Sequence, residues 1–547
     1  MKKRIYIPIL ASVALLLGGC ENNFDAKIYG SLQEGEFPNT AEDYVSYMMT
    51  CYVPFAGNFA YSFNETGQYS FYIGAGGDVR FFDSTSDIMA PTATKAGGEW
   101  LHLTQANFNQ CRYYYRGWPN DQESPNHFPQ TAEVTRFTEI IHTLEVAPEN
   151  VLPAKTRDGL LGEARLCRGM MMYYLMHMYG PVPVIVDYEK VFDDEAQRTT
   201  VRPTLDQMCT YIYDDLLFAA QNAPETQTER GRYTRDYGRF CLMRHCLNEG
   251  GHMAGYYKKG LEMFSELKGK YSLFTQGDNP YKELFKVANE WNSEIIMAVS
   301  CDAGANGNEK HGNINMYSRL VVPSEASAYD PDGNPTALWP QGGGYNAFYN
   351  VAKDFYDSFE ANDKRKECIV TDYWTTDGKH ITGADLGTRW DGYISLKYPI
   401  ETESSYQGSD MTIARWSDAL LQFAELTVRE SGNVTTEAID AVNQVRRRAG
   451  LGDLTAAQTS GKEAFLDAIL TERGHELYYE GCRKIDLIRH NKYARKVYEV
   501  KKTIPTHQYM PLPDYAVRAC EENGVVLEQT FQRDGWNEDR SSVEGGI

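Results

Sequence analysis

The sequence from residue 472 to residue 489 reads ERGHELYYEGCRKIDLIR. Its glutamates at positions 472, 476 and 480 are four residues apart, so in a helix they would lie along one stripe. Carboxylates placed in this way could act as an acid and a base. We predict instead that the arginines of the same segment pair with them and brace the turn at Gly481; these arginines are Arg473, Arg483 and Arg489. Because buried ion pairs fix geometry more than they stabilise, we interpret the segment as a structural joint between helices.

Helical periodicity extends on both sides of this joint. The clearest helix is residues 158–179, where apolar side chains form a wide face and the segment Gly180-Pro181-Val182-Pro183 stops the helix. A second helix starts after Thr40, a typical N-cap residue, and carries Tyr44 and Met48 on one side. The helices that we predict are residues 40–53, 105–116, 131–146, 158–179, 204–220, 236–257, 260–267, 415–431, 436–449 and 462–480.

Two regions lack this periodicity. Residues 54–105 are rich in Gly, Ser and Asp and read as loops, and residues 275–410 carry many glycines and short turn signals such as Asp377-Gly378. We interpret 275–410 as an irregular insertion with a few short strands. The predicted fold is therefore mainly α-helical. Its paired antiparallel helices are similar to tetratricopeptide units, although no exact repeat is visible.

The first twenty residues have the features of an export signal. A basic start, Lys2-Lys3-Arg4, precedes an apolar run from Ile5 to Leu17 that is shorter than the roughly twenty residues needed to span a bilayer. Gly18-Gly19-Cys20 then fits a lipoprotein cleavage site, with the Cys20 thiol as acceptor of the lipid. We expect residues 1–19 to be a signal peptide, residues 20–39 a lipidated tether, and residues 40–547 one domain whose helical core is about 40–270 and 411–547. No later segment is long and apolar enough to span a membrane, so the expected attachment is lipid alone.

Composition narrows the range of ligands. The chain has 547 residues with 75 acidic and 54 basic side chains, a net charge of −21, so it is a poor candidate for binding nucleic acid. The 38 Tyr residues suit a surface that is wet yet adhesive, although helix packing also uses tyrosine. Beyond Cys20, the cysteines show no regular spacing, and we expect most of them to be buried thiols.

Several segments, taken together, resemble the RagB/SusD family of nutrient-binding lipoproteins of Bacteroidetes. They occur in the family's order along nearly the whole mature chain: Leu161–Gly169 with Tyr173-Tyr174 and Tyr179–Pro183; Arg202-Pro203-Thr204 with Ile212, Asp215, Leu216 and Ala219; Asp363 and Arg365; Lys397-Tyr398 with Ile413–Glu425 and Asn443–Gly450; and Glu472–Arg489. The resemblance implies non-catalytic capture of an oligomeric nutrient, most often a glycan, at the outer-membrane surface. It also implies a partner, a SusC-like TonB-dependent transporter that this protein would cap.

Motifs for metal binding or catalysis are incomplete. His475-Glu476 begins like a zinc-binding HExxH motif, but Tyr479 stands where the second His is needed. Asp330-x-Asp332-x-Asn334 begins like a calcium loop, but Pro335 replaces the required Gly. We therefore predict no metal ion, no cofactor and no catalytic residues, and we assign Glu163, Arg165 and Arg168 to ion pairs that support the fold.

Loop aromatics are the remaining candidates for ligand binding. A sugar ring offers a flat C–H face on which Trp or Tyr can stack, while its hydroxyl rim can bond Asp, Asn or Arg. The resemblance implies that ligand contacts come from loops on the face away from the helical repeats. The candidate ligand-binding residues are Asp78, Arg80, Trp100, Trp118, Trp291, Trp339, Tyr345, Trp374 and Trp390.

Three alternatives remain open at this point. The ligand could be an oligopeptide in the same transporter role, and nothing in the sequence separates it from a glycan. A surface-anchored hydrolase needs only two carboxylates at a set separation, and no pair is marked. A purely structural helical-repeat adaptor would bind no small ligand at all.

Overall fold

The computed structural model describes residues 37–56, 70–72, 77–94, 98–110, 127–302, 313–345 and 347–544. The predicted signal peptide and most of the tether, residues 1–36 with Cys20, lie outside this range. Among the helices of the described part, none combines the length and apolar character needed to cross a membrane.

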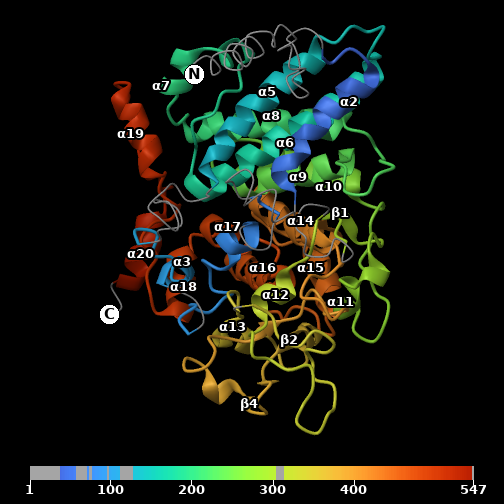
Figure 1. Ribbon diagram of the computed structural model, residues 1–547, viewed down its shortest axis with the longest axis vertical. Helices are drawn as coiled ribbons and strands as arrows, with labels where there is room; N and C mark the ends of the chain where they lie inside the picture. The colour runs from blue at the N-terminus through green and yellow to red at the C-terminus, as the bar shows by residue number, and fades with distance from the viewer. Residues whose placement is uncertain are drawn as a thin grey trace, which may run out of the picture.

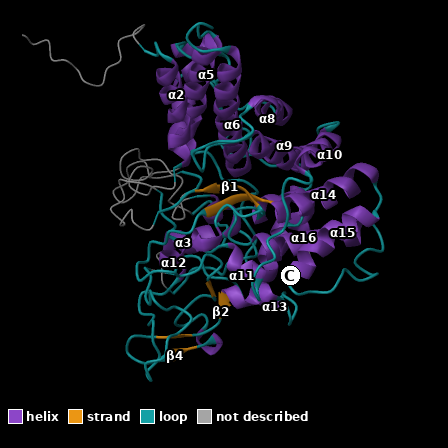
Figure 2. Cartoon of the chain, turned by 90° about the vertical axis from the view of Figure 1, so that its right-hand side faces the viewer, coloured by secondary structure: helices purple, strands orange, loops and turns teal. Residues whose placement is uncertain are grey.

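Eight long helices of the described residues form a continuous series. They are α5 (Thr131–Glu145), α6 (Ala154–Tyr179), α8 (Leu205–Asn222), α9 (Arg235–Glu249), α10 (Tyr256–Leu267), α14 (Trp416–Ser431) and α15 (Thr436–Arg448), with α16 (Lys462–Leu477) closing the series. Each helix packs on the next one: α5 on α6, α6 on α8, α8 on α9, α9 on α10 and α10 on α14, which also contacts α15 and α16. Figure 2 shows this series as an arc along one side of the molecule.

Shorter elements complete the fold. The further helices are α2 (Ala41–Met49), α3 (Gly98–Thr104), α7 (Asp194–Thr199), α11 (Pro280–Leu284), α12 (Tyr317–Val321), α13 (Lys353–Asp357), α17 (Arg483–Arg489), α18 (Tyr493–Lys501), α19 (Asp514–Glu522) and α20 (Trp536–Glu544), together with the π-helical turn η3 (Val79–Asp83). Three two-stranded antiparallel sheets pair β1 with β6, β2 with β5 and β3 with β4. Their bounds are β1 (Ile295–Val299), β2 (Ile369–Val370), β3 (Tyr373–Trp374), β4 (His380–Ile381), β5 (Ile394–Ser395) and β6 (Met411–Arg415). The strands thus lie within or beside the insertion; Figure 1 shows β2 and β4 in the lower part of the molecule and β1 near its middle.

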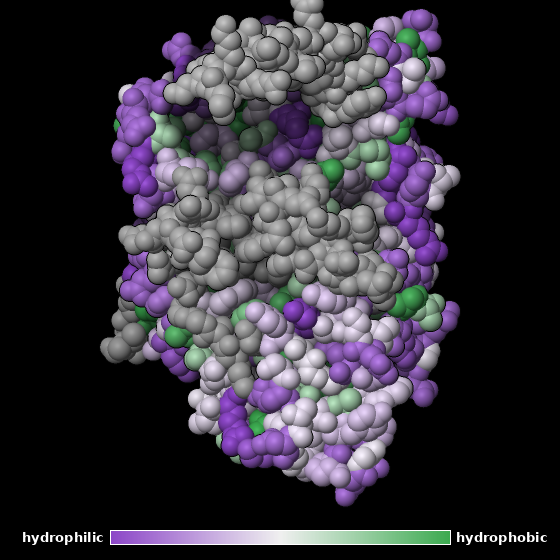
Figure 3. Space-filling view, in the orientation of Figure 1, coloured by the Kyte–Doolittle hydropathy of each residue, from purple (hydrophilic) through white to green (hydrophobic). Residues whose placement is uncertain are grey.

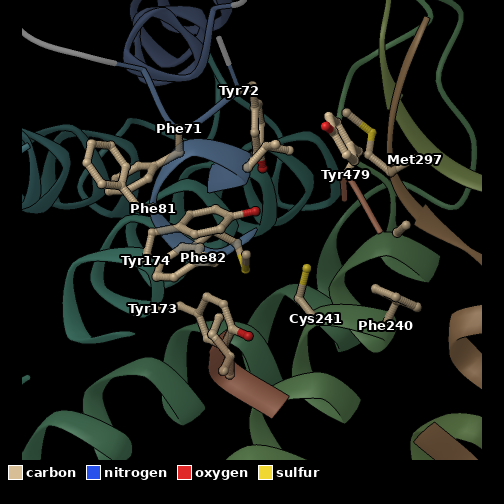
Figure 4. Close-up of a cluster of buried hydrophobic side chains, with 14 of the residues drawn as sticks. Phe71, Tyr72, Phe81, Phe82, Tyr173, Tyr174, Phe240, Cys241, Met297 and Tyr479 are labelled. Atoms are coloured by element: carbon tan, nitrogen blue, oxygen red, sulfur yellow. The ribbon is translucent and has the colours of Figure 1, made fainter. Parts of the chain in front are cut away.

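Helix α6 is the centre of the core because almost its whole circumference is buried after Gly159. It approaches α8 closely at Gly162, where a Cβ atom would lie only 2.5 Å from the backbone nitrogen of Ala223. Phe71 and Tyr72, together with Phe82 of η3, pack against its C-terminal half: Phe71 stacks on Tyr174 with ring centroids 4.7 Å apart. Figure 4 shows this cluster, in which aromatic side chains from both segments meet.

Most of the helix predictions are confirmed. Thr40 caps α2 with a full capping box, and Thr204 caps α8 in the same way. The prediction for residues 105–116 is wrong where the structure describes it, because 105–110 are turns that follow α3. The predicted helix 236–257 is interrupted after Glu249, and α16 ends at Leu477 instead of residue 480.

The early end of α16 changes the ion pairs of the joint. Tyr479 and Gly481 both have positive φ, of 62° and 71°, so Glu480 leaves the stripe of Glu472 and Glu476. Two backbone N–H groups of this turn, those of Gly481 and Arg483, donate to the carboxylate of Asp83. Asp83 therefore holds the turn and the start of α17.

The predicted pairing of arginines with glutamates within the segment is wrong. The glutamates instead face arginines from other segments. Arg365 Nη1 lies 2.7 Å from Glu472 Oε1 and 3.1 Å from Glu476 Oε2, Arg415 Nη2 lies 2.7 Å from Glu480 Oε1, and Arg448 also pairs with Glu476. The three arginines of the segment bind other carboxylates: Arg473 pairs with Asp418 and Asp486, Arg483 with Asp87, and Arg489 with Glu425 and Asp486. The structural role that we predicted is confirmed, because these groups are buried and each is ion-paired with a side chain of another segment or turn. The assignment of Glu163, Arg165 and Arg168 to ion pairs that support the fold is confirmed as well. Glu163 binds Arg232, Arg168 binds Asp215, and Arg165 binds Glu145.

The described residues include nine cysteines, all of them free thiols. Eight are buried and Cys301 is half-buried, as we expected from their apolar surroundings.

Candidate ligand-binding surface

Five side chains from four segments form a partly exposed surface that we call the aromatic patch. They are Trp100, Arg319, Tyr345, Phe348 and Tyr406. The backbone brings them together, because the N–H of Tyr345 donates to the carbonyl of Arg319 and the N–H of Phe348 donates to that of Leu320. Tyr345 and Phe348 are thereby held against α12, which carries Arg319.

The rings of the patch lie in contact with one another. Trp100 on α3 stacks on Phe348 with ring centroids 4.2 Å apart and an interplanar angle of 4°. Tyr345 meets Phe348 edge to face at 5.9 Å and is 49% exposed. Trp100 and Phe348 are half-buried, and Phe348 lies between Trp100 and the exposed Tyr345 in this series of contacts.

Arg319 adds a cation to these rings. Its guanidinium lies 4.9 Å from the Tyr345 ring and 5.0 Å from the Tyr406 ring, and Nη1 donates to the hydroxyl of Ser405. Among the described residues, no carboxylate lies within ion-pair distance of this guanidinium. The patch therefore offers ring faces beside unused N–H donors, a combination that suits a ring with a flat apolar face and a polar rim.

A second exposed group lies farther along the insertion. Trp339 is 49% exposed, and its indole N–H donates to the hydroxyl of Tyr329, which is equally exposed. Trp374 in β3 stacks on His380 in β4 at 4.4 Å. In both Figure 1 and Figure 2, β4 lies at the lower end of the molecule, away from α3 and α12. The visible surface at this end is mostly pale in Figure 3, neither strongly hydrophilic nor strongly hydrophobic.

Trp291 does not join either group. Its indole N–H donates to Asp410 at 2.7 Å, and the same carboxylate accepts the backbone N–H of Cys301. Trp291 thus anchors the segments that flank the β1–β6 sheet.

Two of the sequence-predicted ligand residues are reassigned to the core. Trp390 is fully buried, and its indole N–H donates to the carbonyl of Thr382. Asp78 is 7% exposed and caps η3 by accepting the N–H of Val79; burial and the neighbouring Asp83 raise its pKa to about 8. Neither side chain can reach a ligand outside the core. The side chain of Arg80 and all of Trp118 lie outside the described residues.

The two partial metal motifs have local roles. His475 stacks on Phe359 at 3.9 Å and bonds Ser358, while Glu476 belongs to the buried ion network. The carboxylate of Asp330 accepts the backbone N–H groups of Asp332 and Asn334, which makes a plain turn.

A large cleft of about 910 Å³ lies on the helical side, between α10, α14 and α15. Its aromatic side chains include Phe264, Trp416 and Phe423. Phe264 stacks on both of the others, at 5.3 Å and 4.2 Å, so these ring faces serve helix packing. The aromatic patch is the better candidate for stacking a ligand, because the Tyr345 ring is exposed.

Two family models match the chain. The model of the SusD family matches residues 293–522, and a second model, described as starch-binding associating with outer membrane, matches residues 101–236. Together the two matches take in most of the helical series and the insertion. The chain belongs to the RagB/SusD family.

Several relatives and solved structures are similar to this SusD-like chain. A SusD-like protein P25 of Formosa agariphila is 22% identical over 73% of this chain and 78% of its own length. The starch-binding protein SusD of Bacteroides thetaiotaomicron is 28% identical over 61% of this chain and 65% of that protein. The structure of a surface glycan-binding protein A from Bacteroides thetaiotaomicron, in complex with laminarihexaose, has a TM-score of 0.66 at 19% identity and covers 90% of this chain and 100% of that chain. The last comparison confirms the mainly helical fold.

Sequence reasoning missed three residues of the aromatic patch: Arg319, Phe348 and Tyr406. Trp residues and turn-rich segments were the features that marked candidate ligand contacts, and Arg319 lies in the short helix α12, which has neither feature. The pair Tyr345 and Phe348, three residues apart in one loop, is the signal that could have led to the patch.

Proposed function

We propose that this SusD-like protein captures an oligosaccharide or polysaccharide at the cell surface without catalysis. The observation that carries the proposal is the aromatic patch, in which the exposed Tyr345 ring lies beside the donors of Arg319. Membership of the RagB/SusD family supports it, as does the fold shared with a glycan-binding protein in complex with laminarihexaose. The acidic groups of the joint do not favour hydrolysis, because Glu472 and Glu476 are buried and paired with arginines.

Capture would serve uptake. We propose that the protein is anchored in the outer membrane through a lipid on Cys20 and delivers its ligand to a SusC-like TonB-dependent transporter. The match to a family described as associating with the outer membrane supports this location. Co-purification of the tagged protein with a transporter from detergent-solubilised outer membranes is the expected result, and recovery of the protein alone would contradict the partnership.

The ligand class is tested by screening. A soluble form of the mature protein that lacks Cys20 and begins at residue 21 is run in native gels that contain single polysaccharides, with laminarin and starch among them. It is titrated in parallel with mixed oligopeptides. We expect slower migration in at least one polysaccharide and no heat of binding with peptides. Binding to peptides with no retention by any polysaccharide would overturn the glycan proposal in favour of an oligopeptide carrier.

A further inference from the structure

A second cluster of reactive side chains lies away from the aromatic patch, where α8 begins and α9 ends. Asp206 and Cys209 are three residues apart in the first turns of α8, so they lie on one face of that helix. Glu249 is the last residue of α9, and His252 follows it by three residues in the next turn. Two helices that pack on each other therefore present two pairs of donor side chains to the same space.

The donor atoms have the spacing of metal ligands. Cys209 Sγ lies 3.6 Å from Glu249 Oε2 and 3.7 Å from His252 Nε2, and the Nε2 and Oε2 atoms are 3.6 Å apart. An atom at the centre of such a triangle would be about 2.1 Å from each donor, close to the bond lengths of zinc to N, O and S ligands. Asp206 Oδ1, 3.8 Å from His252 Nε2, is in reach as a fourth ligand. The described residues contain this one group of Cys, Glu and His donors with atoms close enough to hold a metal ion.

The surroundings support binding. Glu249 is fully buried, and Arg533 donates to both of its oxygens at 2.8 Å and 3.0 Å, which fixes the position of the carboxylate beside Cys209. Each carboxylate oxygen has two lone pairs, so Oε2 can accept from Arg533 and also bind a metal ion. Next to it, Nε2 of the buried His177 lies 3.8 Å from Glu249 Oε1 and has no hydrogen-bond partner among the described residues.

The site also has an entrance. His177, Asp206 and His252 line a cleft of about 570 Å³, and the side chain of Asp206 is 74% exposed. An ion could thus enter from solvent along Asp206 and His252 and reach the buried Cys209 and Glu249.

We propose that Asp206, Cys209, Glu249 and His252 form a binding site for one borderline divalent metal ion, with Zn²⁺ the best match. A thiolate and an imidazole favour Zn²⁺ over Mg²⁺ and Ca²⁺, which prefer oxygen ligands. The thiol of Cys209 gives up its proton to the solvent when the ion binds. The bound ion would clip the start of α8 to the end of α9, within the helical series and away from the aromatic patch.

Cobalt substitution tests the site directly. The mature protein is stripped with EDTA, dialysed and titrated with Co²⁺. We expect one equivalent to produce a thiolate-to-cobalt charge-transfer band in the near ultraviolet, and Zn²⁺ but not Mg²⁺ to displace it. The absence of this band at excess Co²⁺ would overturn the proposal.

Matched variants separate this site from other cysteines and histidines. Cys209→Ser should abolish the band, and His252→Ala, on an exposed turn where folding is not at risk, should weaken Co²⁺ binding at least tenfold. Cys520→Ser and His507→Ala, which change a cysteine and a histidine outside the cluster, should leave the titration unchanged. A band that survives in both Cys209→Ser and His252→Ala, or that is lost in Cys520→Ser, would place the metal elsewhere and contradict the assignment.

Discussion

At the scale of single residues, Arg415 is the centre of the buried network. Its guanidinium is fully buried and binds Glu476 and Glu480 at the end of α16 together with Glu294, which is far from them in the chain. The neighbouring Lys397 and Arg448 complete the charge balance of these carboxylates. The network therefore joins the β1–β6 sheet to the end of α16.

Removal of Arg415 should be costly. In Arg415→Met, three buried carboxylates lose a partner, and we expect a loss of about 3–5 kcal/mol in the free energy of unfolding, measured by urea denaturation. The matched control is Arg447→Met, because Arg447 also pairs with two carboxylates but its side chain is 52% exposed. That change should leave the free energy of unfolding almost unchanged, because water and salt screen an exposed ion pair. Equal losses of unfolding free energy in the two variants would contradict a larger role for the buried network than for an exposed ion pair.

At the scale of elements, the contact between α6 and α8 depends on Gly162. In Gly162→Ala, the new Cβ would lie 2.5 Å from the nitrogen and 2.6 Å from the Cα of Ala223, and backbone atoms cannot move aside as a flexible side chain can. We expect a loss of about 1–3 kcal/mol, seen as a lower Tm by circular dichroism.

The control lies in the same helix. In Gly159→Ala, the nearest atom is 3.5 Å away on Pro224, an ordinary contact. This variant should gain up to about 1 kcal/mol, because Ala favours helix more than Gly does. If both variants lower the Tm by the same amount, the close approach of the two helices is not what Gly162 provides.

The helices could be predicted because their information is local. Apolar spacing predicted α5 and α6, and the threonine cap at Thr40 marked the start of α2. The partners of Glu476 could not be predicted, since they are distant in sequence and the positive φ of Tyr479 ends the stripe. The aromatic patch was predicted only in part for the same reason. Trp100 stacks on Phe348, and the two residues are far apart in the sequence. The proposed zinc ligands form two pairs that are each three residues apart in the sequence, Asp206 with Cys209 and Glu249 with His252. Only the packing of α8 on α9 brings the two pairs together.

At the scale of the whole molecule, the helical series and the insertion have different roles. Figure 2 shows the helices along one side and the loops with α3, α12 and β4 along the other. The series provides a rigid body, while the insertion carries the exposed rings of the aromatic patch.

The lipid anchor is a property of the whole molecule as well. Cys20→Ala should release the protein from the outer membrane into the soluble fraction, with an unchanged circular dichroism spectrum, because the lipid would be its attachment. Cys301→Ala, at another non-core cysteine, should stay with the membrane. Cys20→Ala protein that still sediments with outer membranes from cells without the transporter would contradict the anchor.

Binding of the glycan by the aromatic patch is tested by comparing the affinities of the wild type and two variants in a calorimeter. The polysaccharide retained in the gel screen is titrated into the wild type, Tyr345→Ala and Phe192→Ala. Phe192 is the matched control, because its ring is 68% exposed and lies beside α7, on the helical part of the chain. Loss of one stacked ring costs about 1 kcal/mol, so Tyr345→Ala should bind roughly fivefold more weakly, whereas Phe192→Ala should bind as the wild type does. Wild-type affinity in Tyr345→Ala would contradict the claim.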